Sequence, residues 1–110
     1  MRVLEPVVTY AGMIEALRTG AQLSVVCRKS VTREGGGHNF RGEWLFYVKF
    51  PDEPAQVYVV NQKITPRVVK TLNGVIALLC DLGFKVASVP LLAGESVVQS
   101  NGSAEVRKES

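Results

Sequence analysis

The stretch Glu-Trp-Leu-Phe-Tyr-Val-Lys-Phe, residues 43–50, decides the fold of this chain. Large apolar residues recur at every second position along it, which is the period of a β-strand whose successive side chains point to opposite faces. Pro51 ends the strand because proline has no N–H to donate to a neighbouring strand. We predict that one face of this strand is buried, and that face carries Trp44, Phe46, Val48 and Phe50.

Two further strands are predicted on either side of this one. Upstream, residues 22–28 also alternate with a period of two, which predicts a strand with Leu23, Val25 and Cys27 on one face. Downstream, a third strand is predicted at Gln56–Gln62, after a short turn that contains two prolines. The three strands together predict an antiparallel meander.

A helix is predicted on each side of this meander. Thr9 is a good N-cap for the first helix, and Gly20 stops it. Thr65 and Pro66 suit the N-cap and the first position of the second helix, and Gly83 suits its C-terminal end. Apolar residues recur every three or four positions along the second segment, which is typical of an amphipathic helix packed on a sheet.

These elements predict an α+β fold with a mainly antiparallel sheet of three to four strands covered by helices, in the order α-β-β-β-α-(β). The final strand is expected at Lys85–Leu91, where alternation returns. We expect residues 1–93 to form a single globular domain and residues 94–110, which are mostly polar, to form a disordered C-terminal tail. The order of elements resembles that of the double-stranded RNA-binding domain in topology. The basic cluster at the start of that family's second helix is reduced here to Arg67 and Lys70.

The composition excludes several classes of protein. The chain has 110 residues, of which 46% are hydrophobic and 21% charged, so as a whole it is neither disordered nor a coiled coil. The longest nearly apolar stretch, residues 72–80, is far shorter than the roughly 20 residues that cross a bilayer. Because the N-terminus also has no signal-peptide pattern, we expect a cytoplasmic protein that does not bind membranes. Cys27 and Cys80 lie in apolar periodic segments, which predicts two reduced, buried thiols.

Positive charge is concentrated between the first two strands. The chain has 13 Lys and Arg against 10 Asp and Glu, while the segment Gln22–Arg41 has four cations against Glu34 alone. Lys29–Gly42 is polar with three consecutive glycines at its middle, which predicts a long, mobile hairpin loop. Such a loop can reach along a phosphate backbone while Phe40 stacks on a base. The alternative is a solvated loop whose charges only keep the protein soluble. The candidate nucleic-acid-binding residues are Arg28, Lys29, Arg33, Phe40, Arg41, Lys63, Arg67 and Lys70.

Aromatic residues suggest a second candidate surface. We expect Tyr47 and Tyr58, on neighbouring strands, to share the second face of the sheet. If no helix covers that face, these residues and Lys49 form an exposed surface for single-stranded nucleic acid, a protein partner or a second copy of the chain. The alternative is that the tyrosines pack under the first helix or in a homodimer.

The sequence contains no recognisable catalytic or cofactor motif. His38, the single histidine, lies on the expected mobile loop, whereas Cys27 is expected to face the core, so the two do not predict a nucleophile and its base. Gly35–Gly37 are not followed by the Lys-Ser or Lys-Thr of a nucleotide-binding loop. The cysteines and the histidine also lack the spacing of a zinc site. We therefore expect a small, non-enzymatic accessory module without metal or cofactor. It is expected to bind nucleic acid or, alternatively, a protein partner or itself as a homodimer.

Overall fold

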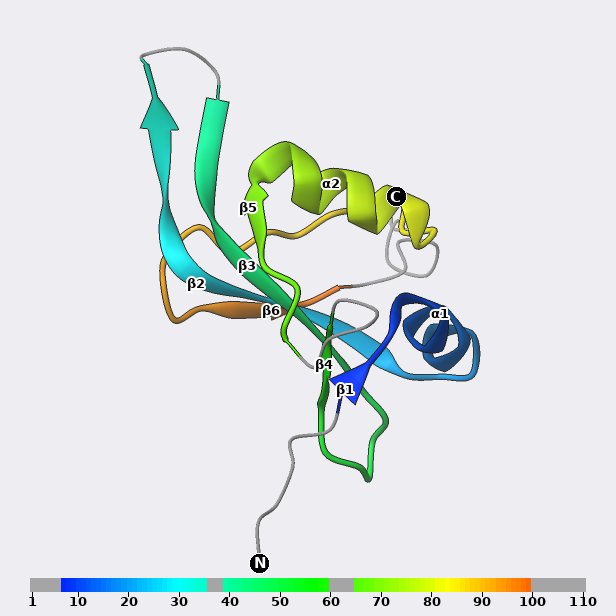
Figure 1. Cartoon of the computed structure of the whole chain (residues 1–110). Coiled ribbons are helices and arrows are strands. Elements are labelled where there is room, and N and C mark those ends of the chain that lie inside the picture. The colour runs from blue at the N-terminus through cyan, green and yellow to red at the C-terminus, as the bar shows by residue number, and fades with distance from the viewer. Residues whose placement is uncertain (1–6, 36–38, 60–64, 100–110) are drawn as a thin grey trace, which may run out of the picture.

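A mixed sheet of six strands carries two helices on one of its faces (Figure 1). The structure is a computed structural model that describes residues 7–35, 39–59 and 65–99. In chain order the elements are β1 (Val7–Val8), α1 (Tyr10–Arg18), β2 (Gln22–Glu34), β3 (Asn39–Lys49), β4 (Gln56–Tyr58), β5 (Val69–Thr71), α2 (Leu72–Asp81) and β6 (Ser96–Val98).

The predicted α+β class is confirmed, whereas the number and order of the strands differ from the prediction. The strand order is β1-β4-β3-β2-β6, and β5 also pairs with β3. Among the described pairs, only β1 and β4 run parallel, and all the others are antiparallel. Since β2 occupies one edge of β3, the strands β4 and β5 pair one after the other along its opposite edge.

The predicted meander of β2, β3 and β4 is present, and its buried face is the predicted one. The register opposes Cys27 to Trp44, Val25 to Phe46 and Leu23 to Val48, so these six side chains share one face. All six are 0–1% exposed. Both helices cover this face, and their inward side chains join the same core; these are Met13 and Ala16 of α1 and Val75 and Leu79 of α2.

Most of Lys29–Gly42, the segment that was expected to be a long loop, belongs instead to β2 and β3. The two strands continue to Glu34 and restart at Asn39, and they remain paired up to these residues. Two register shifts interrupt the pairing near Lys29, and one extra residue is accommodated at each. Gly42 makes this possible, because a Cβ there would lie 2.9 Å from the Lys29 carbonyl oxygen and 3.1 Å from the Trp44 ring.

The outer part of this hairpin projects from the body of the protein (Figure 1). Beyond Val31 and Arg41, no other described strand pairs with either β2 or β3. We call this part, together with the Thr32 and Arg41 pair at its base, the ribbon, and it consists of residues 32–35 and 39–41.

The first helix begins and ends as predicted. The Thr9 side chain accepts a hydrogen bond of 3.2 Å from the Gly12 N–H, which satisfies one of the unpaired donors of the first turn. Gly20 adopts a φ of 114°, a conformation that glycine adopts without strain, and the chain then turns into β2.

The second helix begins later than predicted, at Leu72 rather than after Thr65. Val69, Lys70 and Thr71 instead form β5, because β3 offers a free edge to a segment rich in β-branched residues. Thr71 is the N-cap, and its side chain accepts from the Gly74 N–H at 3.0 Å.

The predicted end of the second helix is confirmed. Gly83 has a φ of 95°, and its N–H donates to the Cys80 carbonyl. The Phe84 N–H donates to the Leu79 carbonyl, which completes a Schellman motif.

The segment after α2 differs from both predictions made for it. Residues 85–91 form no strand; they cross the helix-covered core, where the Trp44 indole N–H donates to the Pro90 carbonyl at 2.9 Å. Residues 96–98 then pair with β2 as β6, so residue 94 is too early a start for the expected tail. Gln99 is 5% exposed and hydrogen-bonds to both the N–H and the carbonyl of Ser88, which ties the end of β6 to the crossing segment. Residues 100–110 lie outside the described residues.

Neither helix in the described part of the chain has the length and apolarity needed to cross a membrane.

Candidate nucleic-acid interface

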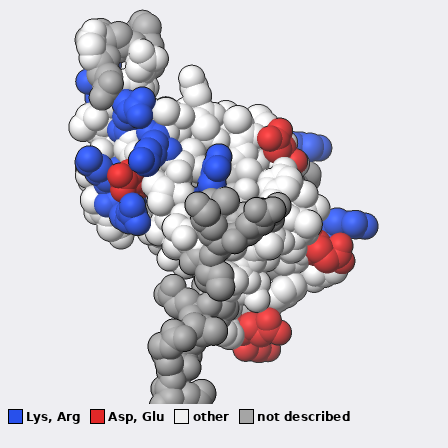
Figure 2. All heavy atoms as spheres, in the orientation of Figure 1, with Lys and Arg blue, Asp and Glu red and all other residues white. Residues whose placement is uncertain are grey.

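A polar depression lies at the root of the ribbon, where β2, β3 and β5 meet. It has a volume of about 250 Å³ and opens to solvent. Figure 2 shows blue Lys and Arg side chains gathered below the ribbon, with a red acidic side chain among them. We call this site the basic depression, and it is lined by Lys29, Ser30, Thr32, Arg41, Gly42, Glu43 and Lys70.

The strands bring these cations together from distant parts of the sequence. The register shift in β2 sets both Arg28 and Lys29 against Glu43 of β3, so two consecutive cations gather on one side of the hairpin. Arg41 lies two residues before Glu43 on β3 and therefore shares its face. Lys70 belongs to β5, where the preceding Val69 is opposed to Trp44 and buried, so Lys70 points away from the core.

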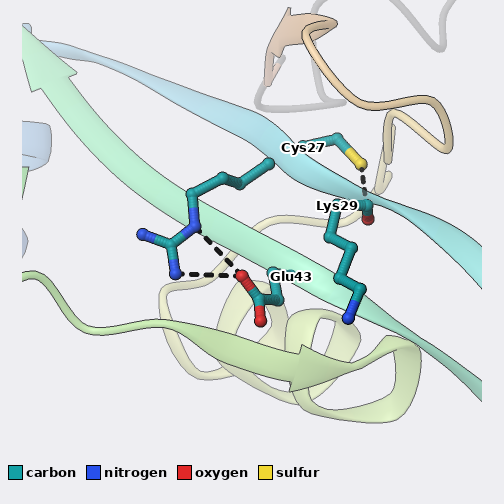
Figure 3. A network of polar contacts seen from close by, with 4 residues as sticks. Cys27, Lys29 and Glu43 are labelled. Atoms are coloured by element: carbon teal, nitrogen blue, oxygen red, sulfur yellow. Dashed lines mark hydrogen bonds and ion pairs between the residues drawn. The ribbon is translucent and has the colours of Figure 1, made fainter.

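Glu43 is the acidic centre of this group (Figure 3). Arg28 donates from Nε and Nη2 to Glu43 Oε1 at 3.0 and 2.9 Å. This hydrogen bonding lowers the pKa of Glu43, and the nearby charges of Arg28, Lys29 and Lys70 lower it further. Glu43 therefore stays ionised at neutral pH. Arg28, Lys29, Arg41 and Lys70 therefore gather around Glu43 among the described side chains.

The two lysines of the depression form no direct ion pair in the described part of the chain. Neither the Lys29 nor the Lys70 ammonium group lies within 4 Å of a carboxylate oxygen there, although both act on the nearby Glu43. The two ammonium groups repel each other, and Glu43 offsets part of this repulsion. A site of this kind favours an anion that can accept several N–H and O–H donors at once.

Arg33 and Phe40 do not join the basic depression. They are direct partners across the ribbon, and the Arg33 guanidinium lies 5.4 Å from the centre of the Phe40 ring. The neighbouring pair, Thr32 and Arg41, points to the opposite face of the ribbon, which is the face of the depression. Since Arg33 already covers one face of the Phe40 ring, the expected stacking of a base on Phe40 could use only the other face.

The remaining predicted cations lie elsewhere. Arg67 is exposed in the segment before β5, where its backbone N–H donates to the Tyr58 carbonyl at 2.9 Å, and it does not line the depression. Lys63 lies outside the described residues.

The expected tyrosine surface does not form, because the two tyrosines face opposite sides of the sheet. Tyr47 is opposed to Val57 on β4, so the next residue, Tyr58, points to the helix-covered face. There Tyr58 packs on the core with its ring centre 6.2 Å from that of Tyr10. Tyr47 remains half-buried on the helix-free face, and Lys49 is exposed.

The two cysteines differ, although both were expected to be buried. Cys27 is fully buried, and its thiol donates to the Lys29 carbonyl at 3.2 Å. Burial raises the pKa of Cys27, which makes this thiol a poor nucleophile. Cys80 is exposed on α2, outside the apolar face on which it was expected. His38, the other residue of the rejected nucleophile and base pair, lies outside the described residues.

Four residues of the depression were missed from the sequence: Ser30, Thr32, Gly42 and Glu43. Three of them lie in the segment that was expected to be a loop, and loop residues have no predictable facing partners. Gly42, two residues before the predicted core residue Trp44, was a usable signal, because a glycine inside a strand often marks a bulge or a close backbone approach. With this signal, the predicted strand would have begun before Gly42.

Comparison with known proteins adds no relationship: no protein-family model, curated protein or solved structure matches this chain.

Proposed function

We propose that this protein binds nucleic acids by their phosphate backbone, with the basic depression as the main contact. The observation that carries the proposal is the convergence of Lys29, Arg41 and Lys70 from three strands on one depression. These residues are 12 to 41 positions apart along the chain, so only the fold gathers them. An ordinary solvated loop would explain charges that are close in sequence, but it does not account for Lys70.

The chemistry of the depression suits a phosphate group. Lysine supplies three N–H donors and arginine a planar fork of donors, and both bind phosphate oxygens by charge-assisted hydrogen bonds. Thr32 adds a hydroxyl group, which can donate a hydrogen bond to a phosphate oxygen. Arg28 extends the positive surface beside the depression while it is held by Glu43.

Salt dependence of binding tests this proposal directly. Each phosphate that is neutralised contributes about −0.9 to the slope of log K against log salt for duplex DNA. A variant with Lys29→Gln, Arg41→Gln and Lys70→Gln should therefore have a slope that is flatter by about 2.7. When salt rises from 50 to 200 mM, the factor by which affinity falls should therefore be roughly 40 times smaller for the variant than for the unsubstituted protein.

Fluorescence anisotropy of labelled duplex DNA, titrated at several salt concentrations, gives these slopes. The control variant carries Arg18→Gln, Lys49→Gln and Lys85→Gln, which remove the same charge from exposed positions outside the depression. A large change for the first variant and a small one for the second supports the proposal. Equal changes would mean that only the net charge matters, and no binding at low salt would refute the proposal.

A second candidate function is self-association through the helix-free face of the sheet. One observation favours it: five strands contribute a row of laterally paired residues on that face, namely Val7, Val57, Tyr47, Ser24 and Val98. The two ends of this row are open, with Val7 37% and Val98 51% exposed, whereas Val57 is only 2% exposed. A second copy would present the same row, as a two-fold interface requires. Light scattering at high concentration should then give a dimer mass that Tyr47→Lys reduces to that of a monomer. A monomer mass for the unsubstituted protein would exclude this candidate.

A further inference from the structure

We propose that the ribbon enters the major groove of double-stranded DNA while the basic depression holds the adjacent backbone. This inference rests on the proposed function and adds the form of nucleic acid and the way it is bound. It is carried by three properties of the ribbon: its length beyond the body, the polar side chains on both of its faces, and its position directly above the depression (Figures 1 and 2).

The ribbon has the dimensions of a groove-binding element. Two residue pairs, Arg33 with Phe40 and Glu34 with Asn39, lie beyond the last contact with the body, which is the pairing of Arg41 with Thr71 of β5. At about 3.4 Å per residue, these two pairs extend roughly 7 Å from the body, and Gly35 continues beyond them. The major groove of B-form DNA is about 8.5 Å deep and about 12 Å wide, and it admits a two-stranded β-ribbon.

Both faces of the ribbon carry groups that suit a groove. Thr32, Asn39 and Arg41 are exposed on one face, and Arg33 is exposed on the other. Phosphates line both walls of a groove, whereas a flat anionic surface would meet only one face of the ribbon. Arginine and asparagine are also the side chains that hydrogen-bond to the major-groove edges of guanine and adenine.

The position of the depression fits the same arrangement. Arg41 is both the last residue of the ribbon and a lining residue of the depression, so the two surfaces are continuous. Contacts to phosphates position a protein on a duplex, while contacts in the groove read its bases. The depression and the ribbon correspond to these two roles.

Duplex DNA is favoured over the other forms of nucleic acid. The major groove of A-form RNA is deep and narrow and does not admit such an element. Single strands are bound mainly by stacking on open aromatic rings, and Phe40, the aromatic residue of the ribbon, is covered on one face by Arg33.

A charge-neutral shortening of the ribbon tests the inference. Deletion of Arg33 and Glu34 from one strand together with Asn39 and Phe40 from the other removes two residue pairs and keeps residues 35–38. The deletion removes one positive and one negative charge, so the net charge does not change, and every residue of the depression remains. Circular dichroism and thermal denaturation establish that the shortened protein is folded.

We expect the shortened protein to bind duplex DNA at least about tenfold more weakly, because the loss of one good base contact has an effect of this size. Its affinity for single-stranded DNA of the same sequence should stay within about twofold, because that affinity depends on the phosphate contacts that remain. If affinity for the duplex is unchanged, or if both affinities fall equally, the inference is overturned. Tighter binding of the unshortened protein to duplex RNA than to duplex DNA would also overturn it.

Chemical protection with the full chain provides a readout that does not depend on a variant. Dimethyl sulfate methylates guanine N7, which is exposed in the major groove, and adenine N3, which is exposed in the minor groove. The reagent therefore reports on the two grooves separately. We expect protection of guanine N7 in the bound duplex, and protection of adenine N3 alone would overturn the inference. The experiments distinguish failure of this inference from failure of the proposed function. If binding depends on Lys29, Arg41 and Lys70 but not on the ribbon, only the groove-binding mode is wrong.

Discussion

Replacing Trp44 with phenylalanine should destabilise the fold more than any other single ring substitution on β3. Trp44 is fully buried, and its indole N–H donates to the carbonyl of Pro90, which is also buried. The indole is the one hydrogen-bond donor to this carbonyl among the described residues. The bond fixes the segment that crosses the core between α2 and β6, so its loss affects the attachment of the C-terminal strand as well.

The size of the effect follows from two contributions. Leaving a buried carbonyl without a donor costs about 1–3 kcal/mol. Phenylalanine also lacks two of the ring carbons of tryptophan, and burial of each carbon is worth about 0.8 kcal/mol. Together these contributions lower the free energy of unfolding by about 2.6–4.6 kcal/mol. With a urea dependence of about 1.5 kcal/mol per molar, the midpoint of unfolding should fall by about 2–3 M.

Urea denaturation followed by far-ultraviolet circular dichroism measures this shift without relying on the single tryptophan. Tyr47→Phe is the matched control, because Tyr47 lies on the opposite face of the same strand and its hydroxyl group has no hydrogen-bond partner among the described residues. It should change stability by less than about 0.5 kcal/mol. If Trp44→Phe costs no more than this control, the hydrogen bond to Pro90 does not anchor the crossing segment.

Further predictions concern the bulge, the thiols and the acidic centre of the depression. Gly42→Ala should lower the free energy of unfolding by about 1–3 kcal/mol in urea denaturation, because the added methyl group would collide with the backbone of β2 and with the buried indole; an unchanged midpoint would contradict the close approach at the bulge. A thiol reagent should modify Cys80 rapidly in the native protein and Cys27 only after unfolding, so rapid modification of both would refute the burial of Cys27. Glu43→Gln should strengthen binding to duplex DNA at neutral pH and make its salt slope steeper by about 0.9, because one negative charge is lost from the site. Because the pKa of Glu43 is lowered, the unsubstituted carboxylate stays charged and this difference should persist from pH 7.5 to pH 5 in anisotropy titrations; a difference that disappears within this range would show that Glu43 takes up a proton there. The same lowered pKa means that the pair with Arg28 contributes to stability above the ordinary pKa of glutamate, and that this contribution is lost as the pH falls through the lowered value.

Local chemistry was sufficient to predict several elements of this fold. The cap formed by Thr9 and the Schellman end at Gly83 each depend on a few consecutive residues, so they are visible in the sequence. The alternation of residues 43–50 likewise predicted which face of β3 is buried, because the period of two needs no knowledge of the partner strands. These are the parts of the fold in which the nearest neighbours along the chain decide the conformation.

Other predictions failed where a distant strand competed with a local preference. Thr65 and Pro66 are good residues for a helix start, but β3 has an unpaired edge, and residues 69–71 complete it. Residues 96–98 look like part of a polar tail, and they become ordered because β2 presents its other edge to them. Pairing Tyr47 with Val57 likewise turned Tyr58 to the core, since a shift of one residue reverses the face of every side chain.

The amino-acid sequence by itself determined the α+β class, the meander, its buried face and the concentration of cations around the hairpin, because periodicity, caps and charge are properties of short segments. Only the tertiary structure decided which cations meet. The bulge that sets Arg28 and Lys29 against Glu43 depends on the fit between two strands, and Lys70 reaches the depression because β5 pairs with β3 from a place far along the chain. The pairing of β2 with β3 separates Arg33 and Phe40 from that depression, because a pleated ribbon directs adjacent residue pairs to opposite faces.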